Sequence, residues 1–185
     1  MMQLNFDGAS KSNLGKEGYG GVFRDHKGKP LLTFIGSIGW DMNNSVELEG
    51  LWQGLLLAQL HDFFPLLIER DSQILINMVN QILQGTPSYK VVSSWRLAKR
   101  LEVIEQWIST QRAVTFKHIC RDGNKVADLL DNIGVDSGWT LHAGSLNTIA
   151  TALQLKDYNE LVQSDLVQSE KAHLDAGDNN GINGD

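Results

Sequence analysis

The 185-residue sequence has a single cysteine, Cys120, and no long hydrophobic segment. One cysteine cannot form an internal disulfide, so the chain lacks a disulfide framework and a reducing compartment is expected. The longest apolar runs, at 55–58 and 63–68, are far too short to span a bilayer. The first residues have neither a basic start nor an apolar signal core, so nothing indicates secretion. We expect a location inside the cell, in the cytoplasm or nucleus, without membrane contact.

The sequence also lacks an excess of basic residues, and its formal net charge is −6. The negative charge is concentrated late in the chain. Residues 1–137 contain 14 Lys/Arg and 15 Asp/Glu, whereas residues 138–185 contain 2 and 7. If four acids of the first part were metal ligands, its other side chains would carry a net charge of +3. That balance permits phosphate contacts through local basic patches.

Hydrophobic periodicity and turn signals predict the element order βββ-α-β-α-α-β-α. The predicted strands are 2–7, 19–25, 31–38, 66–70 and 114–118, and the predicted helices are 45–63, 71–84, 95–108 and 124–133. Gly134 is expected to end the last helix, and the glycines at 50 and 54 indicate close packing of the first helix on the sheet. The order predicts an α/β domain over 1–138 with a mixed five-stranded sheet, a three-stranded antiparallel meander plus two parallel strands, flanked by helices. Residues 139–185 are predicted to be an acidic extension, partly helical and then disordered.

Four acids stand where the predicted elements begin or end: Asp7, Glu47, Asp71 and Asp128. Sites in open α/β sheets form at the carboxyl ends of strands, where helices begin, so these acids could meet there. Four neighbouring carboxylates repel one another unless cations neutralise them, and oxygen ligands suit Mg²⁺ or Mn²⁺. Two such ions roughly 4 Å apart can clamp the oxygens of a phosphodiester displacement. The alternatives are a favourable helix dipole for Glu47 and a helix N-cap for Asp71.

Short motifs add to this pattern. They are Asp7-Gly8-Ala9-Ser10 followed by 19–25, Asn43-Asn44-Ser45-Val46-Glu47, Asp71-Ser72, and the spacing of His118, Asn124 and Asp128. Over residues 1–137 they resemble type 1 ribonuclease H, and most of all the plant retroelement-related, reverse-transcriptase-associated branch of that family. The resemblance implies a ribonuclease H-like fold and an endonuclease that hydrolyses the RNA strand of RNA–DNA hybrids by two-metal-ion catalysis. It implies Mg²⁺, with Mn²⁺ as a substitute.

The resemblance also implies roles for individual residues. Asp7 would contact both metal ions, Glu47, Asp71 and Asp128 would complete the metal-binding set, and His118 would assist proton transfer or product release. The residues expected to contact substrate are Gly8, Ser10, Asn43, Asn44, Ser72 and Asn124. RNA is distinguished from DNA by its 2′-hydroxyls, which the amides of Asn43 and Asn44 could read. The alternative for these two residues is a turn or a helix cap.

A basic cluster and several departures from the family pattern qualify the resemblance. The basic residues Lys90, Arg96, Lys99 and Arg100 are either exposed surface charges or a handle for the hybrid. Arg70 directly precedes Asp71, but neighbouring strand residues point to opposite faces, so Arg70 need not occupy the site. Asp131 adds an acid after Asp128, and Leu14 stands where a proline is usual.

These departures leave alternative functions open. One is a catalytically weak or inactive nucleic-acid-binding module derived from a retroelement, and another is a different nuclease of the same fold, such as an exonuclease. In each case the expected partner is nucleic acid, and a monomer without an obvious protein partner is predicted.

Overall fold

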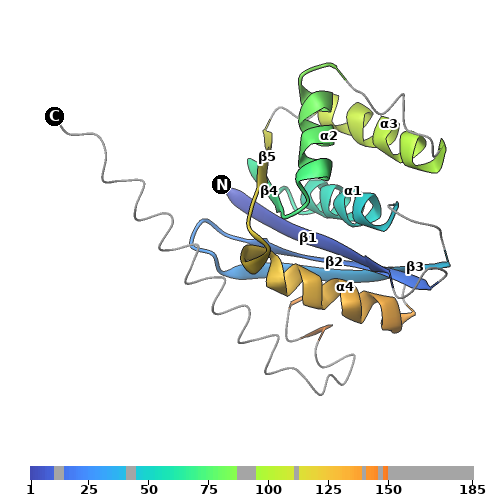
Figure 1. Cartoon of the computed structure of the whole chain (residues 1–185). Coiled ribbons are helices and arrows are strands. Elements are labelled where there is room, and N and C mark those ends of the chain that lie inside the picture. The colour runs from blue at the N-terminus through green and yellow to red at the C-terminus, as the bar shows by residue number, and fades with distance from the viewer. Residues whose placement is uncertain are drawn as a thin grey trace.

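The protein is described here as a computed structural model that covers residues 1–10, 15–40, 45–86, 95–110, 113–138, 141–145 and 148–149. These residues form one sheet with helices on both faces (Figure 1). Helices α1, α2 and α3 lie on one side of the sheet, and α4 covers the other. None of the helices in the described ranges is long and apolar enough to cross a membrane.

The elements follow the order that periodicity predicts. The strands are β1 (Met2–Ser10), β2 (Lys16–Arg24), β3 (Pro30–Trp40), β4 (Leu66–Arg70), β5 (Val114–His118) and β6 (His142–Gly144). The helices are α1 (Ser45–Leu60), α2 (Gln73–Leu83), α3 (Trp95–Thr110), the 3-10 turn η2 (Arg121–Asn124) and α4 (Lys125–Ser137).

The sheet has the strand order β5-β4-β1-β2-β3-β6. Strands β1, β2 and β3 form the predicted antiparallel meander, and β4 and β5 are parallel to β1. The prediction of a mixed α/β sheet is therefore confirmed. A sixth strand was not predicted: β6 pairs antiparallel with β3 through three residues, and Ile149 beyond it is fully buried. The domain boundary after residue 138 stays a prediction, but residues 142–144 lie beyond it and join the sheet.

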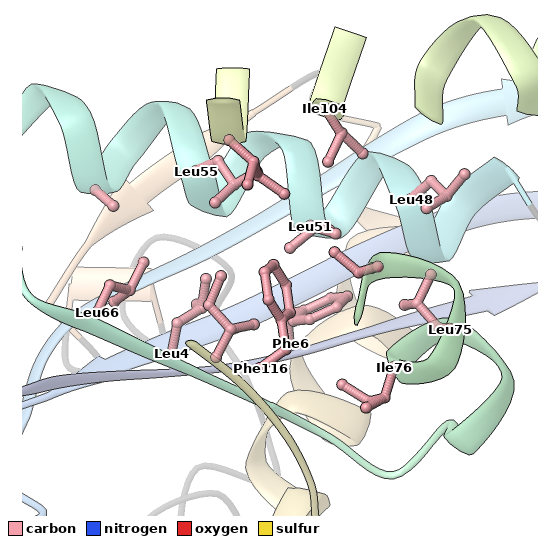
Figure 2. Close-up of a cluster of buried hydrophobic side chains, with 14 of the residues drawn as sticks. Leu4, Phe6, Leu48, Leu51, Leu55, Leu66, Leu75, Ile76, Ile104 and Phe116 are labelled. Atoms are coloured by element: carbon pink, nitrogen blue, oxygen red, sulfur yellow. The ribbon is translucent and has the colours of Figure 1, made fainter. Parts of the chain in front are cut away.

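The main core lies between the sheet and α1, where Leu4 and Phe6 of β1 meet Leu51 and Leu55 of α1 (Figure 2). Glycine at position 50 permits this close contact. A Cβ there would lie 3.1 Å from the carbonyl oxygen of Asp7. The predicted close packing is thus confirmed, and it brings the first turn of α1 beside the end of β1.

Helix α4 packs against the opposite face of the sheet, and its backbone approaches β2 and β3 closely. The prediction that Gly134 ends this helix is wrong. A Cβ on Gly134 would lie 2.6 Å from the carbonyl oxygen of Gly36, so glycine is required for packing within the helix. The helix continues to Ser137 and ends at Gly138, whose φ of 68° lies in the left-handed region that glycine favours.

Candidate active site

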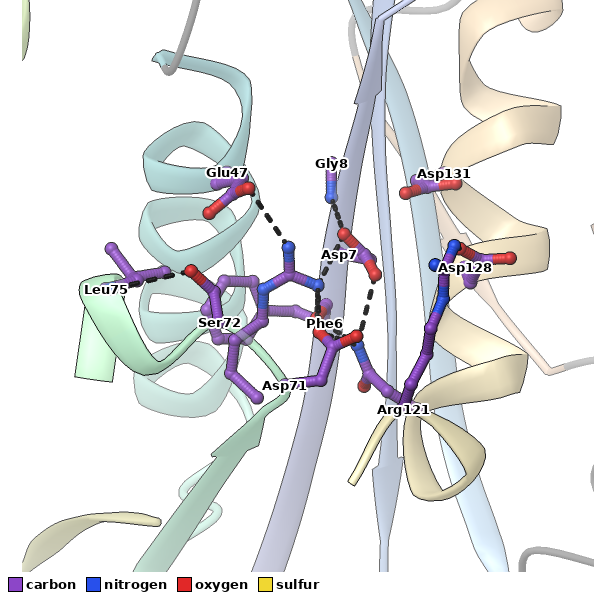
Figure 3. Close-up of polar contacts among 12 residues, drawn as sticks. Phe6, Asp7, Gly8, Glu47, Asp71, Ser72, Leu75, Arg121, Asp128 and Asp131 are labelled. Atoms are coloured by element: carbon purple, nitrogen blue, oxygen red, sulfur yellow. Dashed lines mark hydrogen bonds and ion pairs between the residues drawn. The ribbon is translucent and has the colours of Figure 1, made fainter. Parts of the chain in front are cut away.

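The fold brings the four predicted acids to one edge of the sheet (Figure 3). Asp7 is on β1, and Asp71 directly follows β4, which is the parallel neighbour of β1. Glu47 and Asp128 lie in the first turns of α1 and α4, the helices on the two faces of the sheet. Residues more than 100 positions apart in the sequence therefore converge where β4 ends, beside Asp7. The prediction that Asp7 ends its strand is wrong, because β1 continues to Ser10 through pairing with β2.

Arg70 lies at the centre of this cluster. Its guanidinium forms an ion pair with Asp7, and its Nη1 and Nη2 lie 3.0 Å from Asp71 Oδ1 and 3.2 Å from Glu47 Oε1. Nη1 also donates a hydrogen bond of 3.3 Å to the carbonyl oxygen of Phe6. The residue is only 4% exposed. Arg70 thus pairs with three of the four predicted metal ligands.

The expectation that Arg70 need not occupy the site is therefore wrong in this structure. Arg70 shares a strand face with Ile68, which belongs to the core beneath α1. The guanidinium extends from the end of that face toward Glu47 and Asp7. Asp71 lies just beyond the last residue of β4, so strand alternation no longer directs its side chain away from that of Arg70.

Asn124 orients two of the carboxylates, those of Asp7 and Asp71, through its side-chain amide. Its Nδ2 donates to Asp7 Oδ2 at 3.1 Å, to Asp71 Oδ1 at 3.3 Å and to the carbonyl oxygen of Phe6 at 3.1 Å. The residue is only 1% exposed. The backbone N–H of Gly8 donates to the other oxygen of Asp7 at 2.6 Å. Asn124 therefore positions the acids, and its contact with substrate stays a prediction.

Burial dominates the electrostatics of the acids on β1 and α1. Burial raises the pKa of Asp7, although ion pairing with Arg70 acts in the opposite direction. Burial likewise raises the pKa of Glu47, and again Arg70 partly offsets it. For Arg70, burial lowers the pKa, but the surrounding carboxylates outweigh it and raise the value overall, so the guanidinium remains charged.

Asp131 is a fifth acid near the site, which the sequence pattern showed as an extra acid after Asp128 but did not predict to belong to the cluster. It lies one turn after Asp128, on the side of α4 that faces β1 (Figure 3), and it is 2% exposed. Burial, followed by repulsion from Asp7 and Asp128, raises the pKa of Asp131 to about 9. Its side chain accepts a hydrogen bond of 2.9 Å from Asn132. Near neutral pH Asp131 is a neutral carboxylic acid beside the charged cluster.

The fourth predicted ligand, Asp128, sits in more open surroundings. It forms an ion pair with Arg121 of η2, whose Nη2 lies 3.5 Å from Asp128 Oδ1. The two side chains are 82% and 44% exposed. An exposed pair of this kind contributes little to stability because water and salt screen it.

His118 ends β5 and lies beside Asp71, with its Nε2 3.2 Å from the carbonyl oxygen of Asp71. Its side chain is exposed at the edge of the cluster. The structure therefore brings His118 together with the acids, as its position in the motif predicts.

The other predicted substrate contacts have structural roles here or lie outside the described residues. A Cβ on Gly8 would lie 2.8 Å from the backbone nitrogen of Glu47, so glycine lets α1 approach β1. Ser72 is the N-cap of α2, and its hydroxyl accepts from the backbone N–H of Leu75 at 3.4 Å. Ser10 is exposed at the end of β1. Asn43 and Asn44 lie outside the described residues, so their predicted roles are not placed.

The predicted basic cluster is only partly described. Lys90 and the side chain of Arg96 lie outside the described part. Arg100 forms an ion pair with Glu49 of α1 and lies over the ring of Trp52 at 5.9 Å. Arg100 thus links α3 to α1, and a contact between this cluster and a hybrid stays a prediction.

The carboxylates of the cluster are the type of ligand that a divalent metal ion prefers, but they are not arranged around an open metal site in this structure. Hard cations prefer carboxylate oxygens at about 2.1 Å for Mg²⁺. Three of the four carboxylates instead surround the guanidinium of Arg70. Accordingly, no group of three or more candidate ligands in the described ranges is arranged to hold a metal ion. In this arrangement the guanidinium of Arg70 lies between Asp7, Glu47 and Asp71.

Comparison with known proteins assigns the chain to a family. Residues 5–133, well over half of the chain, match the model of the reverse transcriptase-like family. A protein of Arabidopsis thaliana named for ribonuclease H is 25% identical over 84% of the chain, and ribonuclease HI of Streptomyces coelicolor is 30% identical over 68%. The chain spans 24% and 56% of the length of these two relatives.

Solved structures agree with the sequence relatives. The ribonuclease H1 called LC11, isolated from compost, is 26% identical, with a TM-score of 0.62 over 74% of this chain and 96% of its own. Its complex with an RNA/DNA hybrid matches with a TM-score of 0.61 over the same share of this chain and 98% of its own. The family match, the sequence relatives and the shared fold together show that the chain belongs to the reverse transcriptase-like family and is a member of the type 1 ribonuclease H family.

Proposed function

We propose that this protein is a Mg²⁺-dependent endonuclease that hydrolyses the RNA strand of RNA–DNA hybrids. The observation that carries the proposal is the convergence of Asp7, Glu47 and Asp71 on a single cationic group at the carboxyl end of β4. Asp128 stands at the same edge on α4. The relative LC11 binds an RNA/DNA hybrid, which supports the choice of substrate.

In this proposal the four acids hold the metal ions, and bound Mg²⁺ would supply Lewis-acid stabilisation of the phosphodiester displacement. Asn124 and the N–H of Gly8 fix the two oxygens of Asp7, so this ligand is oriented in advance. His118 lies at the rim of the cluster beside Asp71, where an imidazole can transfer a proton to or from solvent. The carboxylates become free for metal only when Arg70 moves away.

The direct test is incubation of a hybrid with a labelled RNA strand in Mg²⁺ or Mn²⁺. The parent protein and Asp71→Asn are compared, because Asn keeps the size of the side chain and removes a charged metal ligand. Asp122→Asn is the matched control, since this exposed acid of η2 forms a surface ion pair with Lys125, 3.2 Å away. We expect internal cuts in the RNA strand by the parent and the control, and none by Asp71→Asn. Equal cutting by Asp71→Asn would refute the assignment.

Arg70 also favours a second candidate function, a hybrid-binding module with weak or no catalysis. The buried guanidinium of Arg70 offsets one carboxylate charge among the three that it pairs with, so the cluster depends less on metal ions for charge balance. Binding of the hybrid without turnover, in both Mg²⁺ and Mn²⁺, would favour this candidate. Cleavage of single-stranded DNA but not of hybrids would point instead to a different nuclease of the same fold.

A further inference from the structure

We propose that Arg70 is an internal cation that competes with divalent metal ions for Asp7, Glu47 and Asp71, and that displacement of this side chain sets the metal affinity of the site. The inference rests on the proposed function only in taking these three carboxylates as metal ligands. It concerns metal binding by the free protein, without substrate, and is independent of whether a hybrid is cleaved.

Arg70 occupies the space that a metal ion would need beside the three carboxylates. The two terminal nitrogens of Arg70 lie 3.0 Å from Asp71 Oδ1 and 3.2 Å from Glu47 Oε1, and the guanidinium also contacts Asp7. A Mg²⁺ ion that bridges the same oxygens must lie about 2.1 Å from each of them. The nitrogens of Arg70 occupy that volume, so metal and guanidinium cannot share these oxygens.

The positive charge of Arg70 also stabilises the three carboxylates in the absence of metal. Arg70 brings one positive charge to three carboxylates in a buried location, where Coulomb interactions are stronger than in water. The guanidinium therefore stabilises the cluster without metal, and each divalent ion must first overcome that stabilisation. Competition for the same oxygens follows directly from this geometry.

The guanidinium of Arg70 is held mainly by the carboxylates themselves. Among the described residues, its buried Nε has no hydrogen-bond partner, and beyond the acids its contacts are the carbonyl oxygen and the ring of Phe6. A guanidinium has five N–H donors, and full satisfaction would hold it more firmly. The side chain is thus positioned by the charges that a metal ion would neutralise, so a bound metal ion removes most of what retains it.

Arg121 provides the contrast within the same site. It approaches Asp128 at 3.5 Å, but its side chain is 82% exposed, and Asp128 is the one predicted ligand that it pairs with in the described ranges. Solvent screens this pair, and the long side chain can turn away at little cost. Arg121 is therefore the matched control, because it is an arginine beside a predicted ligand that does not block the centre of the cluster.

The experiment measures Mn²⁺ binding to the full chain without nucleic acid, by calorimetry and by electron paramagnetic resonance of free Mn²⁺. Arg70→Gln is expected to bind Mn²⁺ at least about tenfold more tightly than the parent, since the loss of one unit charge near a bound cation changes an equilibrium by that factor or more. Arg121→Gln is expected to change the affinity much less. Arg70→Lys keeps the charge and is expected to gain less than Arg70→Gln.

Equal Mn²⁺ affinity of the parent and Arg70→Gln would overturn the inference, and so would an equal gain in Arg121→Gln or Arg70→Lys. If Arg70→Gln is unfolded without metal, its thermal unfolding is followed over a Mn²⁺ titration. A steeper rise of Tm with Mn²⁺ than in the parent supports the inference, because a ligand stabilises the state that binds it, and an equal rise overturns it. Failure to cleave a hybrid would refute the proposed function and leave this result unaffected.

Discussion

The buried acid Asp131 makes the stability of this protein depend on pH, and replacing it with asparagine should remove its contribution to that dependence. Asn has nearly the same shape as Asp, and its side-chain oxygen can still accept the hydrogen bond from Asn132. The side chain is 2% exposed, so burial disfavours its charged form in the folded protein. The substitution therefore changes the titration and little else.

The direction of the effect follows from the pKa of Asp131, which burial raises to about 9 from its ordinary value of 3.8. Below pH 3.8 the carboxyl is protonated in both the folded and unfolded states. Above it only the unfolded state loses the proton, so stability falls as pH rises toward 9. Each pH unit in this window weakens folding about tenfold, or roughly 1.4 kcal/mol.

The assay is urea unfolding of the parent and Asp131→Asn at several pH values from 5 to 8, followed by tryptophan fluorescence. A chelator keeps divalent ions from neutralising the cluster. The stability advantage of Asp131→Asn should grow by on the order of 1 kcal/mol for each pH unit. The raised pKa values of Asp7 and Glu47 act in the same direction and leave some slope in the variant. Parallel stability curves would refute the reasoning, and so would the same divergence in the surface variant Asp122→Asn.

Three further substitutions test the packing and hydrogen bonds that build the site. Gly134→Ala should destabilise the protein by about 1–3 kcal/mol in urea unfolding, because the added methyl group meets the carbonyl oxygens of β2 and β3. Gly123→Ala is the control, because a methyl group there would make an ordinary contact of 3.4 Å. An equal loss of stability in both variants would contradict the close packing of Gly134 on the sheet. Asn124→Ala should cost about 1–3 kcal/mol, since it removes the amide donor to Asp7 Oδ2 and leaves Arg70 as the remaining side-chain donor to the carbonyl oxygen of Phe6. An unchanged urea midpoint would show that the bonds of Asn124 are not formed. Ser72→Ala should lower the free energy of unfolding by about 1 kcal/mol, because α2 loses its N-cap. Ser72→Thr keeps the hydroxyl and should retain most of the stability. Equal losses in the two variants would contradict the capping role.

Much of the fold was predictable because its signals are local. Alternating apolar residues define β1, and the sequence Asp71-Ser72 marks the point where β4 ends and α2 begins. The errors arise where a tertiary contact overrides a local signal. Gly134 looks like a helix end, but it is a close contact with the sheet. The three residues of β6 form a strand only because β3 offers an open edge.

The candidate site was predictable in its acids but not in its electrostatics. Strand and helix ends placed Asp7, Glu47, Asp71 and Asp128 correctly at one edge. Arg70 was misjudged because alternation applies within a strand, and Asp71 lies just outside it. The burial of Asn124 and Asp131 depends on how α4 packs against the sheet, which no local pattern reveals. Both residues stood in the sequence, but their hydrogen bonds and charges are tertiary properties.

The central claim is that these carboxylates cleave the RNA strand of a hybrid and that Arg70 limits their use of metal. The most direct measurement is single-turnover cleavage of a hybrid, with either strand labelled, over rising Mg²⁺ and Mn²⁺ in the parent, Arg70→Gln and Asp71→Asn. We predict cuts in the RNA strand alone, a lower metal requirement in Arg70→Gln and no cleavage by Asp71→Asn. An intact RNA strand at every metal concentration, in both the parent and Arg70→Gln, would contradict the account.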